Sequence, residues 1–188
     1  MSRALSREDI RELLVELAAE LHSRGISADV FLVGGAAMTV AYDARRATRD
    51  LDAVFAPAAA VREAAAAVAE RRGLPADWLN DAVKGFLPGQ DRAPRRFFTT
   101  PSLRVDVASP EYLLAMKLFS SRVEADFDDV MFLYRLLGFT TVDEGLNLVS
   151  NAYADRPIHP KVQYLVAEVV QALAGRPGAE RTTQTPEP

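Results

Sequence analysis

The sequence predicts an α+β fold in which a small mixed sheet carries flanking helices and a helical bundle follows it. Three observations indicate this class. Segments of helical and strand pattern alternate up to residue 107, in the order helix, strand, helix, strand, helix, strand, strand. The segments after residue 109 have helical periodicity alone. A doubly wound α/β fold would need more strand–helix units than this order supplies.

Each element of the first part has a local reason. Ser6 and Gly25 bracket a segment whose leucines recur three or four residues apart, which is typical of an amphipathic helix with caps. Short apolar runs that stop at glycine or proline predict buried strands, and an alanine-rich segment predicts a stable helix. The predicted elements are helices at 6–25, 36–43 and 58–72, strands at 29–33, 51–55, 97–100 and 103–107, and a short helix around Trp78 within an irregular segment at 73–96.

The C-terminal part is predicted to be helical. Ser109-Pro110-Glu111 opens a helix, because serine is a favourable N-cap and proline fits the first helical position. Further helices are expected at 126–137, 142–150 and 160–173. The sequence thus predicts a core at 1–108, a helical region at 109–174 packed on it, and a disordered tail at 175–188 without large apolar residues.

Composition excludes several classes of site and location. The 188 residues include no cysteine and two distant histidines, which argues against disulfides, Cys-ligated zinc, thiol nucleophiles, histidine-rich metal sites and serine-type triads. The absence of an 18-residue apolar run or a signal-peptide pattern leads us to expect a cytoplasmic protein with no membrane partner. The net charge is −4, but Lys84–Arg104 carries five bases and one acid, so a polyanionic partner is not excluded.

A glycine pair, Gly34-Gly35, lies between a predicted strand and a predicted helix. Glycines at this junction let backbone amides approach a phosphate closely. The pair alone is a weak signal, because tight turns also use two glycines. The chain has neither a P-loop nor a dinucleotide-binding glycine motif.

Three aspartates are the candidate metal ligands. Asp50 and Asp52 are two residues apart on a predicted strand, so both project from one face with Cα atoms about 6.5 Å apart. Two such carboxylates repel unless a cation lies between them, and oxygen ligands suit Mg²⁺. The alternative is a surface pair balanced by nearby arginines. Asp106, in an otherwise apolar strand, favours the metal, since a third carboxylate would complete a two-metal site for nucleotidyl or phosphoryl transfer.

Three segments together resemble a known family. FLVGGAAMTVAYDARRATRDLDAVF, LRVDVASPEYLLAMKLFSS and ADFDDVMFLYRLLG are similar to the minimal nucleotidyltransferases of the polymerase-β superfamily. Within it, the likeness is to AbiEii and MenT-type toxins of bacterial toxin–antitoxin systems and covers roughly residues 28–175. The resemblance implies a polymerase-β-like nucleotidyltransferase core with an appended helical bundle.

The resemblance also implies roles for the residues that match its motifs. Gly34 and Gly35 would contact the triphosphate of a nucleoside triphosphate substrate. Asp50 and Asp52 would bind two Mg²⁺ ions together with Asp106. Asp106 would in addition help to deprotonate the attacking hydroxyl.

Further matches extend this predicted site. Lys117 would neutralise phosphate charge, and Asp126 and Asp129 match the acidic motif that follows the lysine. The family usually has arginine where this chain has alanine before Asp126, so helix capping is the alternative role for these acids. Arg46 and Arg49 could hold phosphate or instead pair with a neighbouring acid.

Thr48 is a candidate regulatory position. It stands two residues before Asp50, so its hydroxyl is expected on the same side as both acids. A phosphate of about −2 charge there would repel a nucleoside triphosphate. Some MenT-like toxins are silenced at this position through the partner antitoxin, so the resemblance implies a cognate antitoxin as partner.

The leading hypothesis is an Mg²⁺-dependent toxin that transfers a nucleoside monophosphate to the 3′ end of tRNA and so blocks aminoacylation and translation. The alternatives are a nucleotidyltransferase antitoxin that AMPylates a partner toxin, and a catalytically inactive binding scaffold. The basic stretch at 84–104 favours RNA as the acceptor.

Overall fold

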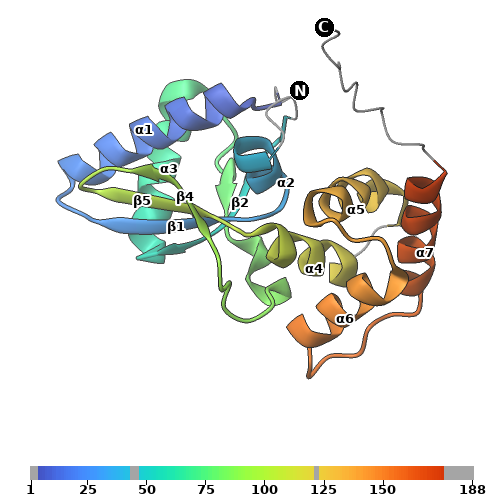
Figure 1. Cartoon of the computed structure of the whole chain (residues 1–188). Helices are drawn as coiled ribbons and strands as arrows, with labels where there is room; N and C mark the ends of the chain where they lie inside the picture. The colour runs from blue at the N-terminus through green and yellow to red at the C-terminus, as the bar shows by residue number, and fades with distance from the viewer. Residues whose placement is uncertain (1–3, 43–46, 121–122, 176–188) are drawn as a thin grey trace, which may run out of the picture.

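A small mixed sheet forms the centre of the N-terminal part, as predicted, and it contains β3 in addition to the four strands expected from the sequence (Figure 1). The computed structural model describes residues 4–42, 47–120 and 123–175. The strand order is β3-β2-β1-β5-β4, with β1 parallel to β5 and antiparallel to β2. Strand β3 is parallel to β2, and β4 is antiparallel to β5. The strands span Ala28–Leu32 (β1), Leu51–Ala56 (β2), Leu79–Asn80 (β3), Arg95–Thr99 (β4) and Leu103–Val107 (β5).

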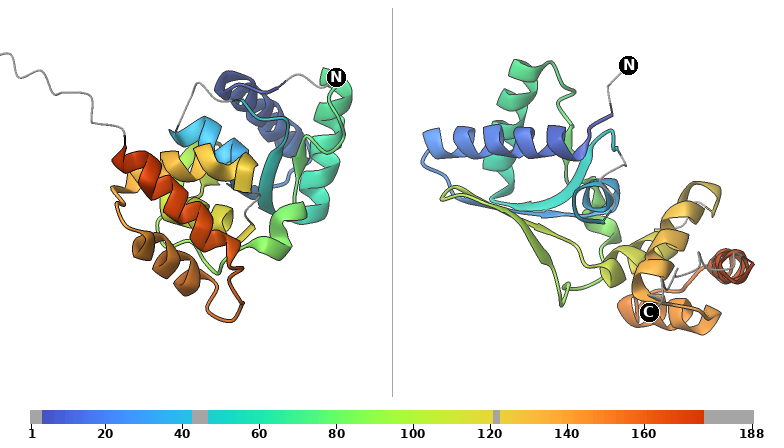
Figure 2. Two further views of the ribbon diagram at one scale, coloured as in Figure 1. Left: turned by 90° about the vertical axis from the view of Figure 1, so that its right-hand side faces the viewer. Right: turned by 45° about the horizontal axis from the view of Figure 1, so that its top comes forward.

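Two helices cover one face of this sheet. They are α1 (Arg7–Ser23) and α3 (Ala58–Arg72), which pack against each other and lie on the same side of the strands (Figure 1; Figure 2). Alternate residues of β1, β2 and β5 are buried, which gives the core beneath these helices. Because successive strand residues point to opposite faces, Phe31, Asp52 and Asp106 project from the other face.

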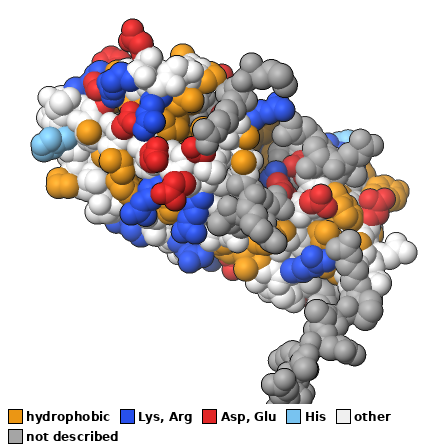
Figure 3. Space-filling view, turned by 90° about the horizontal axis from the view of Figure 1, so that it is seen from above, with side chains coloured by type: hydrophobic (Ala, Val, Ile, Leu, Met, Phe, Trp, Pro, Cys, Tyr) orange, Lys and Arg blue, Asp and Glu red, His pale blue; other side chains and the backbone are white. Residues whose placement is uncertain are grey.

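Ion pairs connect the outer surfaces of α1 and α3. Glu20 accepts from Arg24 and from Arg71, each at 2.8 Å, and these hydrogen bonds hold the pKa of Glu20 below its ordinary value. Acidic and basic side chains are interspersed over this face (Figure 3). Exposed pairs of this kind contribute little individually, about 0.2–1 kcal/mol each.

Four helices form the C-terminal region. Two residues separate α4 from β5. Helix α4 contacts α5 and α6, while α7 packs on α5 and α6 (Figure 2). Ser109 caps α4 as predicted, since its hydroxyl accepts from the Tyr112 N–H at 3.2 Å. Among the described residues, no helix is long and apolar enough to cross a membrane. The helices are Pro110–Ser120 (α4), Val123–Leu137 (α5), Val142–Ala152 (α6) and Lys161–Ala174 (α7).

The structure corrects two predicted elements. The short helix expected around Trp78 is wrong: Trp78 is buried, donates its indole N–H to Ala65 O at 2.9 Å, and leads into β3. The short helix comes later, as the 3-10 helix η2 at Ala82–Phe86. The helix expected at 36–43 begins at the glycine pair as α2 (Gly34–Ala37) and continues as the π-helical segment η1 (Met38–Tyr42). Of the tail expected at 175–188, residues 176–188 lie outside the described part of the chain.

Candidate active site

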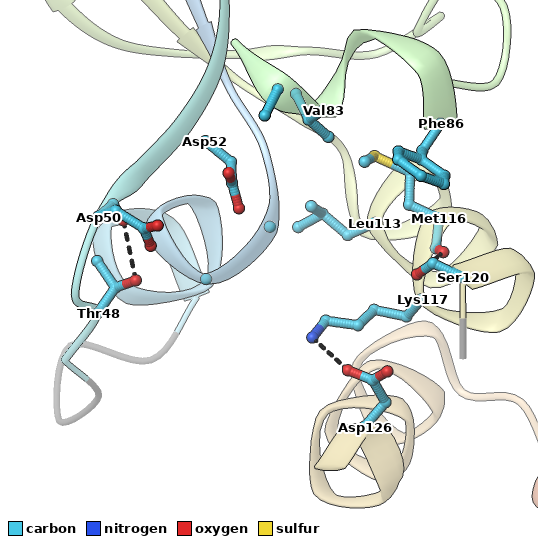
Figure 4. Close-up of a pocket in the computed structure, with 13 residues that line it drawn as sticks. Thr48, Asp50, Asp52, Val83, Phe86, Leu113, Met116, Lys117, Ser120 and Asp126 are labelled. Atoms are coloured by element: carbon cyan, nitrogen blue, oxygen red, sulfur yellow. Dashed lines mark hydrogen bonds and ion pairs between the residues drawn. The ribbon is translucent and has the colours of Figure 1, made fainter. Parts of the chain in front are cut away.

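A pocket of about 440 Å³ opens where the sheet meets the helical region (Figure 4). The C-terminal end of β1 and the N-terminal end of β2 meet at this edge, because the two strands are antiparallel. Strand β5 runs parallel to β1 and delivers α4 to the same edge. The sheet therefore brings the glycine pair, the Asp-x-Asp segment and α4 together, although they are distant in the sequence.

The glycine pair allows the backbone to approach the functional side chains closely. Gly34 has a φ of +57°, which favours glycine, and a Cβ there would lie 3.0 Å from Asp52 Oδ2. A Cβ on Gly35 would lie 3.0 Å from Thr48 Oγ1. Both glycines line the pocket, so their backbone atoms and the Asp52 carboxylate face the same space.

Asp50 and Asp52 form the acidic side of the pocket (Figure 4). Asp50 is exposed and lies just before β2, whereas Asp52 is half-buried within the strand. Their oxygen atoms fit Mg²⁺, which one or two protein carboxylates hold together with water and substrate phosphates. A Cβ on residue 34 would crowd Asp52 Oδ2, so the glycine keeps this carboxylate oxygen open to the pocket. In the described ranges, no group of three or more His, Cys, Asp or Glu side chains could hold a metal ion.

The structure places Asp106 outside this pocket, so the expected three-acid cluster is not formed. Strand β1 lies between β2 and β5, and Asp106 pairs with Phe31 of β1, which in turn pairs with Val54 of β2. Asp106 is thus two strands and two residues away from Asp52, about 12 Å between Cα atoms from ordinary strand spacings. Its carboxylate forms an ion pair with Arg96.

Lys117 and Asp126 lie across the pocket from Asp50 and Asp52 (Figure 4). Lys117 Nζ lies 2.8 Å from Asp126 Oδ1 and 2.7 Å from Asp129 Oδ2. The two acids are three residues apart on α5, so they occupy one face of that helix. The Asp126 side chain is 4% exposed and that of Lys117 is 18% exposed, so this ion pair is largely shielded from water. The acidic motif therefore fixes the position of the lysine.

The remaining predicted residues divide into three cases. Thr48 lines the pocket, and its hydroxyl donates to Asp50 O at 3.0 Å. Its backbone exchanges two hydrogen bonds with Leu5, of 2.6 and 3.0 Å. Arg49 is exposed and does not line the pocket. Arg46 lies outside the described residues.

An apolar wall was not anticipated from the sequence. It consists of Val83 and Phe86 from η2, with Leu113 and Met116 from α4 beside them (Figure 4). Phe86 is 54% exposed although it is aromatic. The sequence offers one signal, a phenylalanine within an irregular, glycine-containing segment where no periodic partner would bury it.

The pocket thus combines a glycine turn, two carboxylates, a lysine and an apolar wall, which is the mixture of polar and apolar groups typical of a ligand site. Residues 10–143 match the model of a family described as "Nucleotidyltransferase of unknown function (DUF6036)", and the chain belongs to this family. The match includes the whole pocket lining, from Gly34 to Asp126. No significant match was found among curated proteins or among solved structures.

Proposed function

We propose that this protein is an Mg²⁺-dependent nucleotidyltransferase that transfers a nucleoside monophosphate from a nucleoside triphosphate to an acceptor hydroxyl. The observation that carries this proposal is one pocket in which Asp50 and Asp52 face Lys117 and which the glycine pair also lines. Membership of a nucleotidyltransferase family supports the same reaction. In the reaction, a bond forms between the acceptor oxygen and the α-phosphorus, and the bond to the β-phosphate oxygen breaks to release pyrophosphate.

The residues of the pocket divide the work between binding and proton transfer. Asp50 and Asp52 are the residues that would hold Mg²⁺, which when bound neutralises phosphate charge and polarises phosphate oxygens. Lys117 donates to the phosphates, and its ion pairs with Asp126 and Asp129 orient the amine. Asp106 lies away from the pocket, so we assign the proton of the attacking hydroxyl to Asp50, the more exposed of the two pocket aspartates.

The 3′ end of tRNA is the proposed acceptor, in line with the AbiEii and MenT-type resemblance and a toxin role. Exposed arginines on β4 and β5 and in the preceding loop support it, because phosphate contacts dominate nucleic-acid affinity. One observation favours a protein acceptor as the second candidate. Arg96 and Arg104 are paired with Asp106 and Asp29, which reduces the positive charge available to RNA.

Thr48 remains the proposed point of regulation by an antitoxin partner. Its hydroxyl lies on the pocket wall, 3.0 Å from the point that a Cβ on residue 35 would occupy. A phosphate on this oxygen would place about two negative charges where the triphosphate is proposed to bind, and would exclude it by repulsion and bulk.

The test is transfer of label from each α-³²P nucleoside triphosphate to total tRNA in the presence of Mg²⁺. Asp52→Asn is compared with Asp29→Asn, because Asp29 is an exposed aspartate of the neighbouring strand that pairs with Arg104 and does not line the pocket. We expect label in tRNA with the wild type and Asp29→Asn, and a loss of at least about 100-fold with Asp52→Asn. Label in a coexpressed protein instead of tRNA would move the protein acceptor to first place, and no label in either would overturn the proposal.

A further inference from the structure

We infer that the apolar wall is the nucleobase subsite, that Phe86 is its stacking side chain, and that Tyr153 of the helical region is a positioning residue for Phe86. This inference rests on the proposed function in one respect, namely that the ligand of the pocket is a nucleotide. It assigns a role to the apolar wall, which takes no part in the proposed contacts with phosphate and metal.

Exposure singles out Phe86. Four large apolar side chains of the described residues are strongly exposed, at Val15, Phe86, Leu136 and Tyr164. Phe86 is the member of this group that lines the pocket, where Val83 and Met116 extend its apolar surface. An exposed apolar surface beside convergent polar groups is the usual composition of a ligand site.

The placement of the wall suits a nucleotide. Figure 4 shows Phe86 and Met116 on the side of the pocket away from Asp50 and Asp52, with Lys117 below the space between them. A triphosphate at the glycine pair would therefore direct its nucleoside towards Phe86. A flat aromatic side chain at that position can stack on any nucleobase.

Hydrogen bonds from the helical region hold the segment that carries Phe86. The Tyr153 hydroxyl donates to Phe86 O at 2.6 Å, and Arg156 Nη1 donates to Gly85 O at 3.1 Å. The Tyr153 ring stacks on Phe119 of α4, with centroids 3.9 Å apart and planes 9° from parallel. Burial raises the pKa of Tyr153, so its hydroxyl remains a donor throughout the physiological range.

The other end of η2 is anchored to the surface of α3. Asp81, just before η2, forms ion pairs with Arg62 of α3 at 2.6 Å and with Lys84. The short helix is thus held from α3 on one side and from the segment between α6 and α7 on the other. Its backbone is fixed before a ligand arrives, which lowers the entropic cost of stacking a base on Phe86.

The experiment measures binding of two probes by calorimetry in Mg²⁺: ATP, which has a base, and inorganic tripolyphosphate, which has none. For Phe86→Ala we expect the ATP affinity to fall about tenfold, and for Phe86→Trp to stay close to wild type. Tripolyphosphate affinity should be unchanged in both. Leu136→Ala, which removes another exposed apolar side chain away from the pocket, should change neither.

The positioning role has its own matched pair. Tyr153→Phe keeps the ring on Phe119 and removes the hydroxyl that holds Phe86 O, so it should weaken ATP about threefold without affecting tripolyphosphate. Tyr112→Phe removes a similar hydroxyl that donates to Pro88 O at 2.9 Å in the same loop, and should leave both affinities unchanged. A merely structural tyrosine would weaken both probes equally or neither, and either result would overturn this role.

The two proposals fail in different ways. If Phe86→Ala binds ATP as tightly as the wild type while the wild type still transfers nucleotide, the nucleobase subsite is wrong and the proposed function stands. If ATP binds with the expected dependence on Phe86 but no acceptor is labelled, the subsite stands and the transferase is wrong. If neither probe binds to the wild type, both proposals are overturned.

Discussion

Gly34 shows how a single backbone position controls the acidic side of the pocket. Its left-handed conformation strains any other residue, and a Cβ would meet Asp52 Oδ2 at 3.0 Å. Gly34→Ala should therefore cost about 1–2 kcal/mol of stability and also displace the Asp52 carboxylate. We expect MgATP binding to be lost, as measured by calorimetry, while urea unfolding reports the stability.

Gly73 provides the control for this change. It has a similar φ of +63°, but a Cβ there would have nothing within 4 Å. Gly73→Ala should show a similar loss of stability and leave MgATP binding intact. Equal nucleotide affinity in the two variants would contradict the role assigned to Gly34.

At the same scale, local sequence patterns predicted some site residues and not others. Asp50 and Asp52 are two residues apart in the sequence, so strand alternation alone predicted that they share a face. Asp106 has the same kind of apolar surroundings, but its distance from Asp52 depends on which strand lies between them. Asp126 had a capping alternative in the sequence, and tertiary packing of α5 on α4 brings it to Lys117. Long-range placement of this kind is not encoded in a local pattern.

Helix packing depends at one point on the absence of a side chain. Gly145 of α6 lies against Tyr134 of α5, and a Cβ on residue 145 would overlap the tyrosine hydroxyl oxygen. Burial raises the pKa of Tyr134 to about 12, so this hydroxyl is neutral and enclosed. Gly145→Ala should destabilise the protein by about 3 kcal/mol in urea unfolding.

A glycine with free space is the appropriate comparison. At Gly89 a Cβ would have nothing within 4 Å and the φ is not left-handed, so Gly89→Ala should be close to neutral. Tyr134→Phe combined with Gly145→Ala should recover part of the loss, because it removes the overlapping oxygen. An unchanged unfolding midpoint for Gly145→Ala would contradict this packing.

The start of α6 makes stability depend on pH. Glu144 accepts hydrogen bonds from the Thr140 N–H, the Thr141 hydroxyl and the Thr141 N–H, which lower its pKa below 4.5. A depressed folded-state pKa means that this contribution is present above about pH 4.5 and is lost as the pH falls through the folded value.

The measurement compares the urea midpoint of the wild type with that of Glu144→Gln at pH 7 and at progressively lower pH. We expect the wild type to be more stable at pH 7 and the difference to shrink below about pH 4.5. The glutamine can still occupy the capping position, which isolates the effect of charge. A difference that is constant with pH would show that charge is not the cause.

At the scale of the whole molecule, the sequence predicted the class of fold and most of its elements because burial imposes regular periods. The spacing of the leucines in α1 and the alternation of apolar and polar residues in β1 and β5 both follow from burial of one face. The sheet order and the docking of α4 and α5 were beyond such patterns, because they depend on contacts between distant segments. Phe86 was missed for a related reason: it is exposed, so no periodic burial marks it.

Because β5 connects almost directly to α4, the direction of the Lys117 side chain depends on how many residues separate it from the sheet. Only Ala108 and Ser109 separate the sheet from a helix that turns by about 100° per residue. A substitution in this stretch leaves the direction of Lys117 unchanged. One residue inserted into α4 before Lys117 would instead rotate its amine about a quarter of the way around the helix, out of the pocket. The number of residues between 107 and 117 therefore sets the direction of the Lys117 side chain. The length of this segment matters to the site as much as the charge of the lysine.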